Sequence, residues 1–459
     1  MPETARRGWI AALVALLFGL VLAWGLLRFG GAEAAVLYRI FLLLLVPGVL
    51  AVVGLPMRYL VSPRFVLLPF IGLLLLAMVA LQPELQARGY VHLAVGWLAL
   101  FLTVRVGLGN RSLIRFMAYL LILLGAVEAL YGLAQAIGGS DFIGTYYRGV
   151  GRIATGTLIN RNHFAGMLNM ILPLGLGVLF SGYAMRRRRG SLQSESLALT
   201  WIVILASAFM GLAVLLSQSR GGTISLIATV LFLALLLGFG RRLSKGRNLS
   251  GAVAWILLAT ILGLALVVGV DALLDRFGRL DQDLERFTIY SDTLELVGDH
   301  PLAGVGPGMY RWRFRPYQSI DTLRLYDHAH NDYLESAAEW GIPLALLAWG
   351  FVLWRFSRCV AIFLASRDPE RRGLALGCSA AIFSILTHSL VELLHRGVGE
   401  FLGDVPSLAP IPGRPGAAHV RSLAGKVVGP GQVPGVLRRV HGTDGDTLES
   451  GGEHLLGER

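Results

Sequence analysis

The sequence predicts an all-α polytopic membrane protein with about eleven transmembrane helices. Its 459 residues are 55% hydrophobic and only 15% charged, whereas soluble domains carry about 25% charged residues. Long apolar runs recur along the chain, and a helix needs about 20 apolar residues to cross a bilayer. Basic residues gather in alternate connecting segments, which is the pattern of a chain that crosses a membrane repeatedly.

The first predicted span directly follows Arg6 and Arg7. Ala32-Glu33-Ala34 resembles a signal-peptide cleavage site, but the apolar run is longer than that of a leader, so a retained anchor is expected. The eleven predicted spans are 9–27, 35–55, 65–82, 91–109, 113–137, 160–182, 199–217, 221–240, 251–271, 338–364 and 373–394.

The positive-inside rule orients these spans with the N-terminus in the cytoplasm. The formal net charge of +12 then reflects membrane topology, with basic runs such as Arg186–Arg189 on the inner side, and indicates no nucleic-acid surface. The predicted organisation is nine transmembrane helices in 1–271, a large periplasmic loop in 272–337, two further transmembrane helices in 338–394, and a tail in 395–459.

The tail differs from the rest of the chain in composition. Residues 395–459 are rich in Gly, Pro and Arg and contain no apolar run of span length. Two interpretations are open, a disordered extension or a change of reading frame near Leu394.

A first polar cluster is LLSQSRGGTISL, which places Arg220 between two predicted spans at the outer surface. One interpretation is an interfacial anchor, because a long cationic side chain can reach the headgroup region from a helix end. The other is an oxyanion clamp, because arginine stays charged and its planar fork fits phosphate. Gly221 and Gly222 would let a phosphate approach the backbone.

A second polar cluster, RIATGTLINRNHFAG, lies where the sixth predicted span begins. Helix capping by Asn160 or Asn162 is one interpretation, because asparagine is a preferred N-cap residue. The other is binding of an anionic, hydroxyl-rich ligand, because a helix N-terminus attracts anions. The residues assigned to such a ligand are Arg152, Asn160, Arg161 and Asn162.

A third cluster, YDHAHNDYLESAAEWG, ends the large loop. Asp332 and Glu335 have the spacing of a capping box, so a helix is predicted to begin near Asp332 and run into the membrane. His330 lies just before that helix, whose positive end disfavours the imidazolium form. A neutral histidine there can accept a proton. The alternative is a structural histidine bonded to the loop backbone, and His328 is the weaker candidate base.

These clusters place an arginine, a polar helix start and a histidine on the same side of the membrane. The combination predicts transfer chemistry at the outer leaflet, with histidine deprotonating a hydroxyl and arginine stabilising a departing phosphate. The sequence contains no nucleotide-phosphate loop, nucleophile elbow or metal motif. We therefore expect no metal and no cofactor, and a lipid-linked donor that supplies its own leaving group. Cys359 and Cys378 are interpreted as packing residues.

The same segments resemble the O-antigen ligase and polysaccharide polymerase superfamily of bacterial membrane glycosyltransferases. The ligase signature is His-Asn or His-Ser, nine residues, and then Gly; His330-Asn331 and Gly341 match it. Leu344 departs from the Gly, Thr or Tyr that ends the signature. SQSRGG, GRIATGTLINRNHFAGML and DHPLAGVGPGMY resemble further family segments. The similarity covers roughly 90–394, and THSLVE is not followed by the family's usual twelfth span.

The resemblance implies a metal-independent, inverting glycosyltransferase with a GT-C-like fold in the bacterial inner membrane. It would transfer a glycan from undecaprenyl pyrophosphate to a hydroxyl acceptor, either lipid A-core or a growing glycan, at the periplasmic face. His330 would be the general base, Arg220 would hold the pyrophosphate with help from Arg152, and Asn331 would contact substrate. The expected partners are that lipid-linked glycan, the acceptor and membrane lipid, without nucleic acid.

Two alternatives stay open. A protein O-oligosaccharyltransferase would share the same core and differ in its acceptor. A transporter or flippase for lipid-linked glycans would bury ionisable residues near the middle of its spans. Glu128 is the clear acidic residue of that kind, and the other polar clusters lie at the outer interface, which favours an interfacial enzyme.

Overall fold

The computed structural model describes residues 3–27, 34–54, 99, 111–144, 146–189, 194–243, 281–319 and 326–402. These residues are mostly helical, with one short antiparallel hairpin of β1 (Phe142–Ile143) and β2 (Tyr146–Tyr147). The helices are α1 (Glu3–Leu27), α2 (Ala34–Gly54), α6 (Arg111–Gly138), α7 (Arg161–Arg189), α8 (Ser194–Leu216), α9 (Arg220–Leu243), α12 (Asp281–Asp299), α13 (Tyr310–Arg313), the 3-10 helix η4 (Arg315–Tyr317), α14 (Asp332–Ala365) and α15 (Pro369–Leu402).

Seven helices in the described part of the chain are long and apolar enough to cross a membrane. They fall in α1, α6, α7, α8, α9, α14 and α15, and they coincide with seven of the predicted spans. Helix α2 coincides with the predicted span 35–55. Apart from residue 99, the predicted spans 65–82, 91–109 and 251–271 lie outside the described residues, so the total of eleven stays a prediction.

Helix α15 continues to Leu402, beyond the predicted end of the last span at 394. Residues 403–459 form a separate unit outside the described residues. The two interpretations of the tail therefore stay untested.

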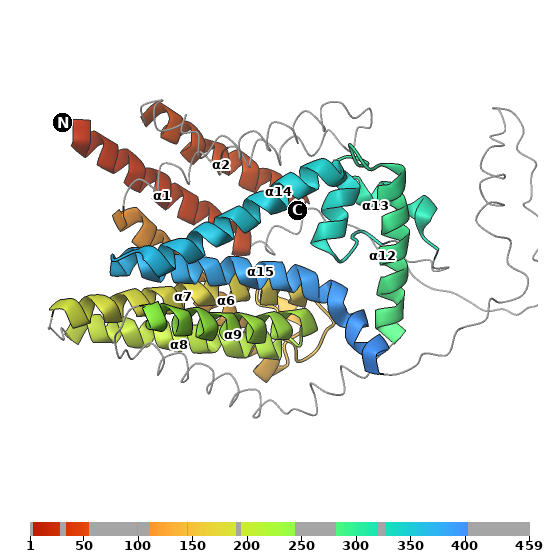
Figure 1. Ribbon diagram of the computed structural model, residues 1–459. Helices are drawn as coiled ribbons and strands as arrows, with labels where there is room; N and C mark the ends of the chain where they lie inside the picture. The colour runs from red at the N-terminus through yellow and green to blue at the C-terminus, as the bar shows by residue number, and fades with distance from the viewer. Residues whose placement is uncertain are drawn as a thin grey trace, which may run out of the picture. The chain divides into compact units, whose positions relative to one another are not determined.

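Helices α6, α7, α8, α9 and α15 share one apolar core (Figure 1). Helices α7 and α15 approach most closely at Gly177 and Gly373, where a Cβ on either glycine would overlap the carbonyl oxygen of the other. Small residues permit such contacts between membrane helices, whose packing depends on close approach and on hydrogen bonds. One such bond fixes α9 to α15, where Ser225 Oγ donates to the buried carbonyl of Ser384 at 2.7 Å.

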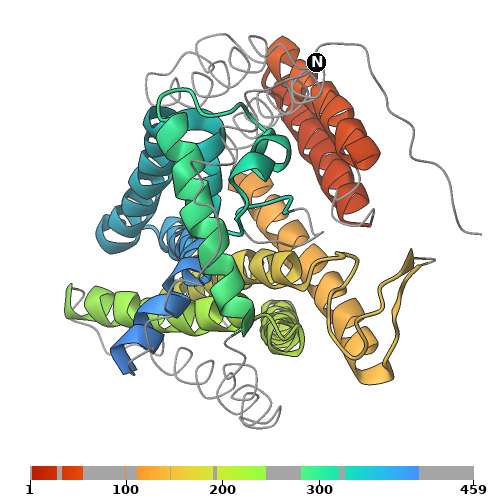
Figure 2. The same cartoon turned by 90° about the vertical axis from the view of Figure 1, so that its right-hand side faces the viewer.

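A second apolar cluster packs α12, α13 and η4 against the start of α14. Figure 2 shows α12, in green, crossing the middle of the view in front of the bundle helices. Tyr310 stacks on Phe314 at 4.8 Å between ring centroids, and its hydroxyl lies 2.7 Å from Thr293 Oγ1. The described residues before α14 therefore pack as one body, in which FTIYSDTLELV forms part of α12.

Helix α14 is interrupted at Gly341, where φ is 76° and ψ is 158°. Pro343 lies inside the helix, and the break is two residues earlier because a neighbouring turn packs against Gly341. The amide of Ile342 donates to Pro301 O at 2.8 Å, and the amide of Val305 donates to Ala338 O at 2.8 Å. The LAGVGPG turn thus holds the first part of α14, which begins at Asp332, at a fixed angle to the span.

Candidate active site at the starts of three helices

Arg220 is the first residue of α9 and is half-buried. Ser219 caps the helix, since its Oγ accepts from the amide of Gly222 at 3.1 Å. Asn169 of α7 donates through Nδ2 to the carbonyl of Gly222 at 2.8 Å, and this contact is buried. The turn of α9 that carries Arg220 is therefore tied to the neighbouring helix, and its guanidinium lies at the positive end of the helix dipole.

The start of α7 is capped by Asn160, whose Oδ1 accepts from the amide of Asn162 at 2.8 Å. Of the two predicted caps, Asn160 is therefore the one that the structure uses. Arg161 and Asn162 occupy the first turn and are half-buried, while His163 is exposed. The start of α7 thus combines a capped helix N-terminus with a guanidinium and an amide, a setting that favours anions.

The loop between α6 and α7 is organised by Arg148, a residue that the sequence did not single out. Its guanidinium donates to Ile153 O at 2.9 Å and to Thr155 Oγ1 at 2.7 Å. Burial lowers the pKa of Arg148, but arginine stays charged at neutral pH. Sequence reasoning could not separate Arg148 from Arg152, because both lie in the same polar loop and only the folded path of the chain assigns their contacts.

Arg152 is exposed and lies against Gly139, at the end of α6. The loop that carries it is anchored to the turn between α8 and α9, since the amide of Ala154 donates to Leu216 O at 3.0 Å. Arg152 is therefore near the same end of the bundle as Arg220. Its side chain lies beside the end of α6, whereas Arg220 is in the first turn of α9.

The start of α14 is capped by Asn331, one residue earlier than the predicted capping box. Asn331 Oδ1 accepts from the amides of Tyr333 and Leu334 at 3.0 and 3.1 Å. Glu335 reaches further back, because its Oε2 accepts from the amide of Ala329 at 2.9 Å. Asn331 is only 1% exposed. Its position favours holding the helix start over direct contact with a substrate.

The two histidines before this cap differ in their surroundings. Nδ1 of His328 lies 2.8 Å from Glu335 Oε1, and this hydrogen bond raises the pKa of His328. His330 is exposed and has a left-handed backbone with φ 54°, and its carbonyl accepts from Tyr290 at 3.3 Å. Such a backbone is uncommon outside glycine and is concentrated at functional sites.

Helix α15 contributes two residues that sequence reasoning did not place in the site. Ser389 donates to the carboxylate of Asp332, the first residue of α14. His388 makes a hydrogen bond to the backbone of Gly221 and lies within charge-interaction range of Asp332 and His163. The THSLVE segment carried the signal for these residues, but in the sequence it was interpreted only as a family resemblance.

The structure thus brings three predicted clusters to one end of the bundle. His163 of α7 interacts electrostatically with His328, Asp332 and Glu335, which joins the starts of α7 and α14. His388 joins the start of α9 to the same group. The starts of α7, α9 and α14, which carry the predicted arginine, amide and histidine residues, therefore lie at the same end of the bundle.

Residues 203–349 match the O-antigen ligase family. This match confirms the resemblance predicted from the sequence, and with the apolar helices it identifies a multi-pass membrane protein. The O-antigen ligase region begins within α8 and includes Arg220, α12, His330 and the break at Gly341. No curated protein matches the chain.

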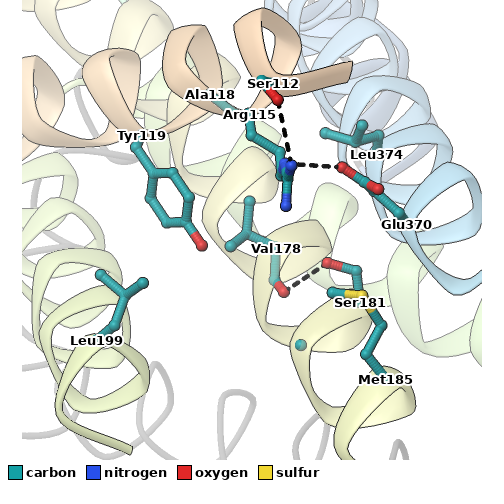
Figure 3. Close-up of a pocket in the computed structure, with 11 residues that line it drawn as sticks. Ser112, Arg115, Ala118, Tyr119, Val178, Ser181, Met185, Leu199, Glu370 and Leu374 are labelled. Atoms are coloured by element: carbon teal, nitrogen blue, oxygen red, sulfur yellow. Dashed lines mark hydrogen bonds and ion pairs between the residues drawn. The ribbon is translucent and has the colours of Figure 1, made fainter. Parts of the chain in front are cut away.

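A cavity of about 400 Å³ lies at the opposite end of the bundle from these helix starts (Figure 3). Arg115 spans its rim, with Nε 3.2 Å from Glu370 Oε1 and Nη2 donating to Ser112 Oγ at 3.5 Å. Val178 and Leu199 line its apolar part. This cavity is therefore separate from the end of the bundle where Arg220 and His330 lie.

Among the described residues, no three His, Cys, Asp or Glu side chains are grouped so that they could hold a metal ion. Cys359 and Cys378 are free and half-buried, in agreement with a packing role.

Proposed function

We propose that this protein transfers or polymerises a glycan from an undecaprenyl-pyrophosphate-linked donor onto a hydroxyl acceptor, at the periplasmic face of the bacterial inner membrane. The proposal rests on one observation, which is that the starts of α7, α9 and α14 lie close together. The starts of α9 and α14 are within the region that matches the O-antigen ligase family, and the start of α7 precedes it. Three helix N-termini in one place create a positive region for a diphosphate.

Arg220 would bind the pyrophosphate of the donor. Its guanidinium can donate two parallel hydrogen bonds to phosphate oxygens, and its place on the first turn of α9 adds the helix dipole. Arg161 and Asn162, on the first turn of α7, would hold the remaining phosphate oxygens or the first sugar. As the bond to the pyrophosphate breaks, negative charge develops on the leaving oxygen, so fixed donors stabilise that state more than the ground state.

His330 would act as the general base. The acceptor hydroxyl oxygen attacks the anomeric carbon, the bond between that carbon and the pyrophosphate oxygen breaks, and the hydroxyl proton passes to the imidazole. Undecaprenyl pyrophosphate leaves with the bonding electron pair, and a single displacement inverts the configuration. A lipid pyrophosphate is a good leaving group, so these steps require neither a metal ion nor a cofactor.

The acceptor distinguishes the remaining candidates. Lipid A-core, a growing glycan and a protein hydroxyl would all present the same nucleophile, and the site geometry favours none of them. Against a transporter, Glu128 is not available for a charged solute, because both of its carboxylate oxygens bind Thr157.

The test is transfer in proteoliposomes that contain purified protein, undecaprenyl-pyrophosphate-linked glycan and one acceptor class at a time. Replacing Arg220 by Ala is expected to lower transfer by about 10²-fold and to weaken donor binding. Replacing His330 by Ala is expected to lower transfer by about 10²-fold or more with donor binding retained. Arg115→Ala, at the opposite end, is the matched arginine control.

Normal transfer by the His330 variant would remove the proposed base. Unchanged donor binding by the Arg220 variant would remove the clamp. Movement of intact donor across the bilayer without any glycosidic bond formation would favour the flippase alternative.

A further inference from the structure

His388 is a buried histidine in the membrane-spanning part of α15, and the proposed chemistry does not use it. The residue is 9% exposed, and its Nδ1 atom is buried without a hydrogen-bond partner in the described part of the structure. A buried polar atom left without a partner costs free energy, so a polar residue at such a position calls for a physical reason.

The ring of His388 contacts the start of α9. It makes a hydrogen bond to the backbone of Gly221, the residue directly after Arg220. Because Nδ1 has no partner, this bond is made by Nε2. The ring also packs on α7, where a Cβ on Gly166 would stand 3.5 Å from Nε2. His388 therefore fills the space between α7 and the first turn of α9.

The same part of α15 holds the start of α14. Ser389 donates to the carboxylate of Asp332, which is also within charge-interaction range of the His388 ring. One turn closer to the helix centre, Leu386 O accepts from the hydroxyl of Tyr333 at 2.9 Å. Asp332 and Tyr333 directly follow the cap that sets the backbone of His330.

We infer that His388 is a positioning residue, which holds the first turn of α9 and the first turn of α14 against each other so that Arg220 and His330 act on one bound donor. This inference rests on the proposed function for the roles of Arg220 and His330. A single imidazole suits the task because one ring nitrogen reaches the backbone of Gly221 while the ring lies within charge-interaction range of Asp332. Figure 1 shows α15, in blue, running beside both α14 and the layer that contains α9.

The test compares two substitutions of His388 with one control in the full-length protein in lipid nanodiscs. Leucine fills a similar volume but cannot bond to Gly221. Glutamine places an amide N–H near the position of Nε2 and can restore that bond. The control is Ser379→Ala, a fully buried serine on the same helix whose hydroxyl bonds only within the helix, to Leu376 O.

Two measurements separate positioning from general stability. Hydrogen exchange of the peptides that contain Gly221–Thr223 and Asn331–Leu334 reports on the two helix starts without any substrate. Binding of undecaprenyl pyrophosphate and single-turnover transfer report on the site. We expect His388→Leu to raise exchange in both peptides and to weaken binding of undecaprenyl pyrophosphate by about tenfold, the effect of one lost buried hydrogen bond. We expect His388→Gln to stay within about threefold of wild type in binding, since an amide can make the same bond.

Exchange in His388→Leu equal to that in Ser379→Ala would overturn the inference. So would a glutamine variant as impaired as the leucine variant, because the bond to Gly221 would then be irrelevant. If wild-type protein binds no undecaprenyl pyrophosphate, the proposed function fails, and the exchange comparison still decides whether His388 holds the two helix starts.

Discussion

Nδ1 of His328 lies 2.8 Å from Oε1 of Glu335, and the other carboxylate oxygen of Glu335 accepts from the amide of Ala329 at 2.9 Å. One carboxylate thus joins the last loop residues before α14 to the first turn of that helix. His330 lies between the loop residues and the helix held in this way, so its position depends on the two hydrogen bonds of Glu335. Glu335 consequently serves the candidate base by fixing the loop.

Replacing Glu335 by Gln should lower the pKa of His328. The pKa of His328 is raised above its usual value of 6.5, mainly by the hydrogen bond to Glu335. The negative charges of Asp327 and Glu339 add to this effect, and His163 also interacts electrostatically with His328. Glutamine keeps an acceptor for the Ala329 amide but removes the charge. The measurement is a histidine NMR titration, with His328→Gln used to assign the signal, and an unchanged midpoint would contradict the assignment.

The same variant should be less stable than wild type mainly at lower pH. A histidine with a raised folded-state pKa stabilises the fold fully below its unfolded pKa of about 6.5, and loses that contribution as pH rises through the folded pKa. The melting temperatures of wild type and Glu335→Gln should therefore differ more at pH 6 than at pH 8.5 (about two units above that unfolded value). An equal difference at both pH values would show that charge is not involved.

Replacing Gly341 by Ala should destabilise the protein by about 2 kcal/mol or more, because its φ and ψ lie in a region that is essentially restricted to glycine. An added Cβ would also stand against the carbonyl of Leu302 and 2.9 Å from the amide nitrogen of Ala303. The measurement is unfolding by SDS titration in mixed micelles. Transfer should fall as well, because the angle between the two parts of α14 sets the position of His330.

The matched control for this prediction is Gly350→Ala on the same helix. A Cβ at Gly350 meets no atom within 4 Å, so alanine should stabilise the helix by about 0.5–1 kcal/mol. Equal effects of the two substitutions would mean that Leu302 and its neighbours do not support the break.

Glu128 and Thr157 should be energetically coupled. Glu128 is 3% exposed and accepts from the Thr157 amide at 2.8 Å and from its hydroxyl at 2.7 Å. Glu128→Ala leaves the Thr157 amide unpaired, while the Thr157 hydroxyl keeps Leu26 O as an acceptor at 2.6 Å, so the substitution should cost about 1–3 kcal/mol. Thr157→Val removes only the hydroxyl and should cost about 1 kcal/mol. The double variant should lose less than the sum of both, by about 1 kcal/mol. If the two destabilisations were strictly additive, Glu128 would not stabilise the loop through Thr157.

Local features of this structure were predictable because local sequence determines them. An apolar run of span length has to form a helix in lipid, where each backbone group needs an internal partner, and this fixed α6, α7, α8 and α9 to within a few residues. The caps at Asn160 and Asn331 follow from asparagine directly before each helix. The N-cap of α14 is Asn331, one residue before the predicted Asp332, and the two were hard to tell apart because both residue types suit an N-cap.

Features that depend on contacts between distant segments were not predictable. The break at Gly341 requires the turn near Pro301, and the structural role of Arg148 requires the folded path of its loop. The THSLVE segment pointed to His388 only as a family resemblance, and its contacts were not predictable because its partners Gly221 and Asp332 lie on other helices. The sequence predicted only that the three helix starts lie on the same side of the membrane. How close they are to one another depends on helix packing.

The orientation of the chain can be tested with single cysteines on opposite ends of the bundle. Ser140 follows α6 at the end that carries the candidate site, and Ser366 lies in the turn between α14 and α15 at the other end. In a background with Cys359→Ala and Cys378→Ala, Ser140→Cys should react with a membrane-impermeant maleimide in spheroplasts, and Ser366→Cys should react only after the membrane is disrupted. The positive-inside rule is the physical reason, because Arg367, Arg371 and Arg372 flank the second position. Labelling of Ser366→Cys in intact spheroplasts would reverse the orientation and move the proposed site to the cytoplasmic face.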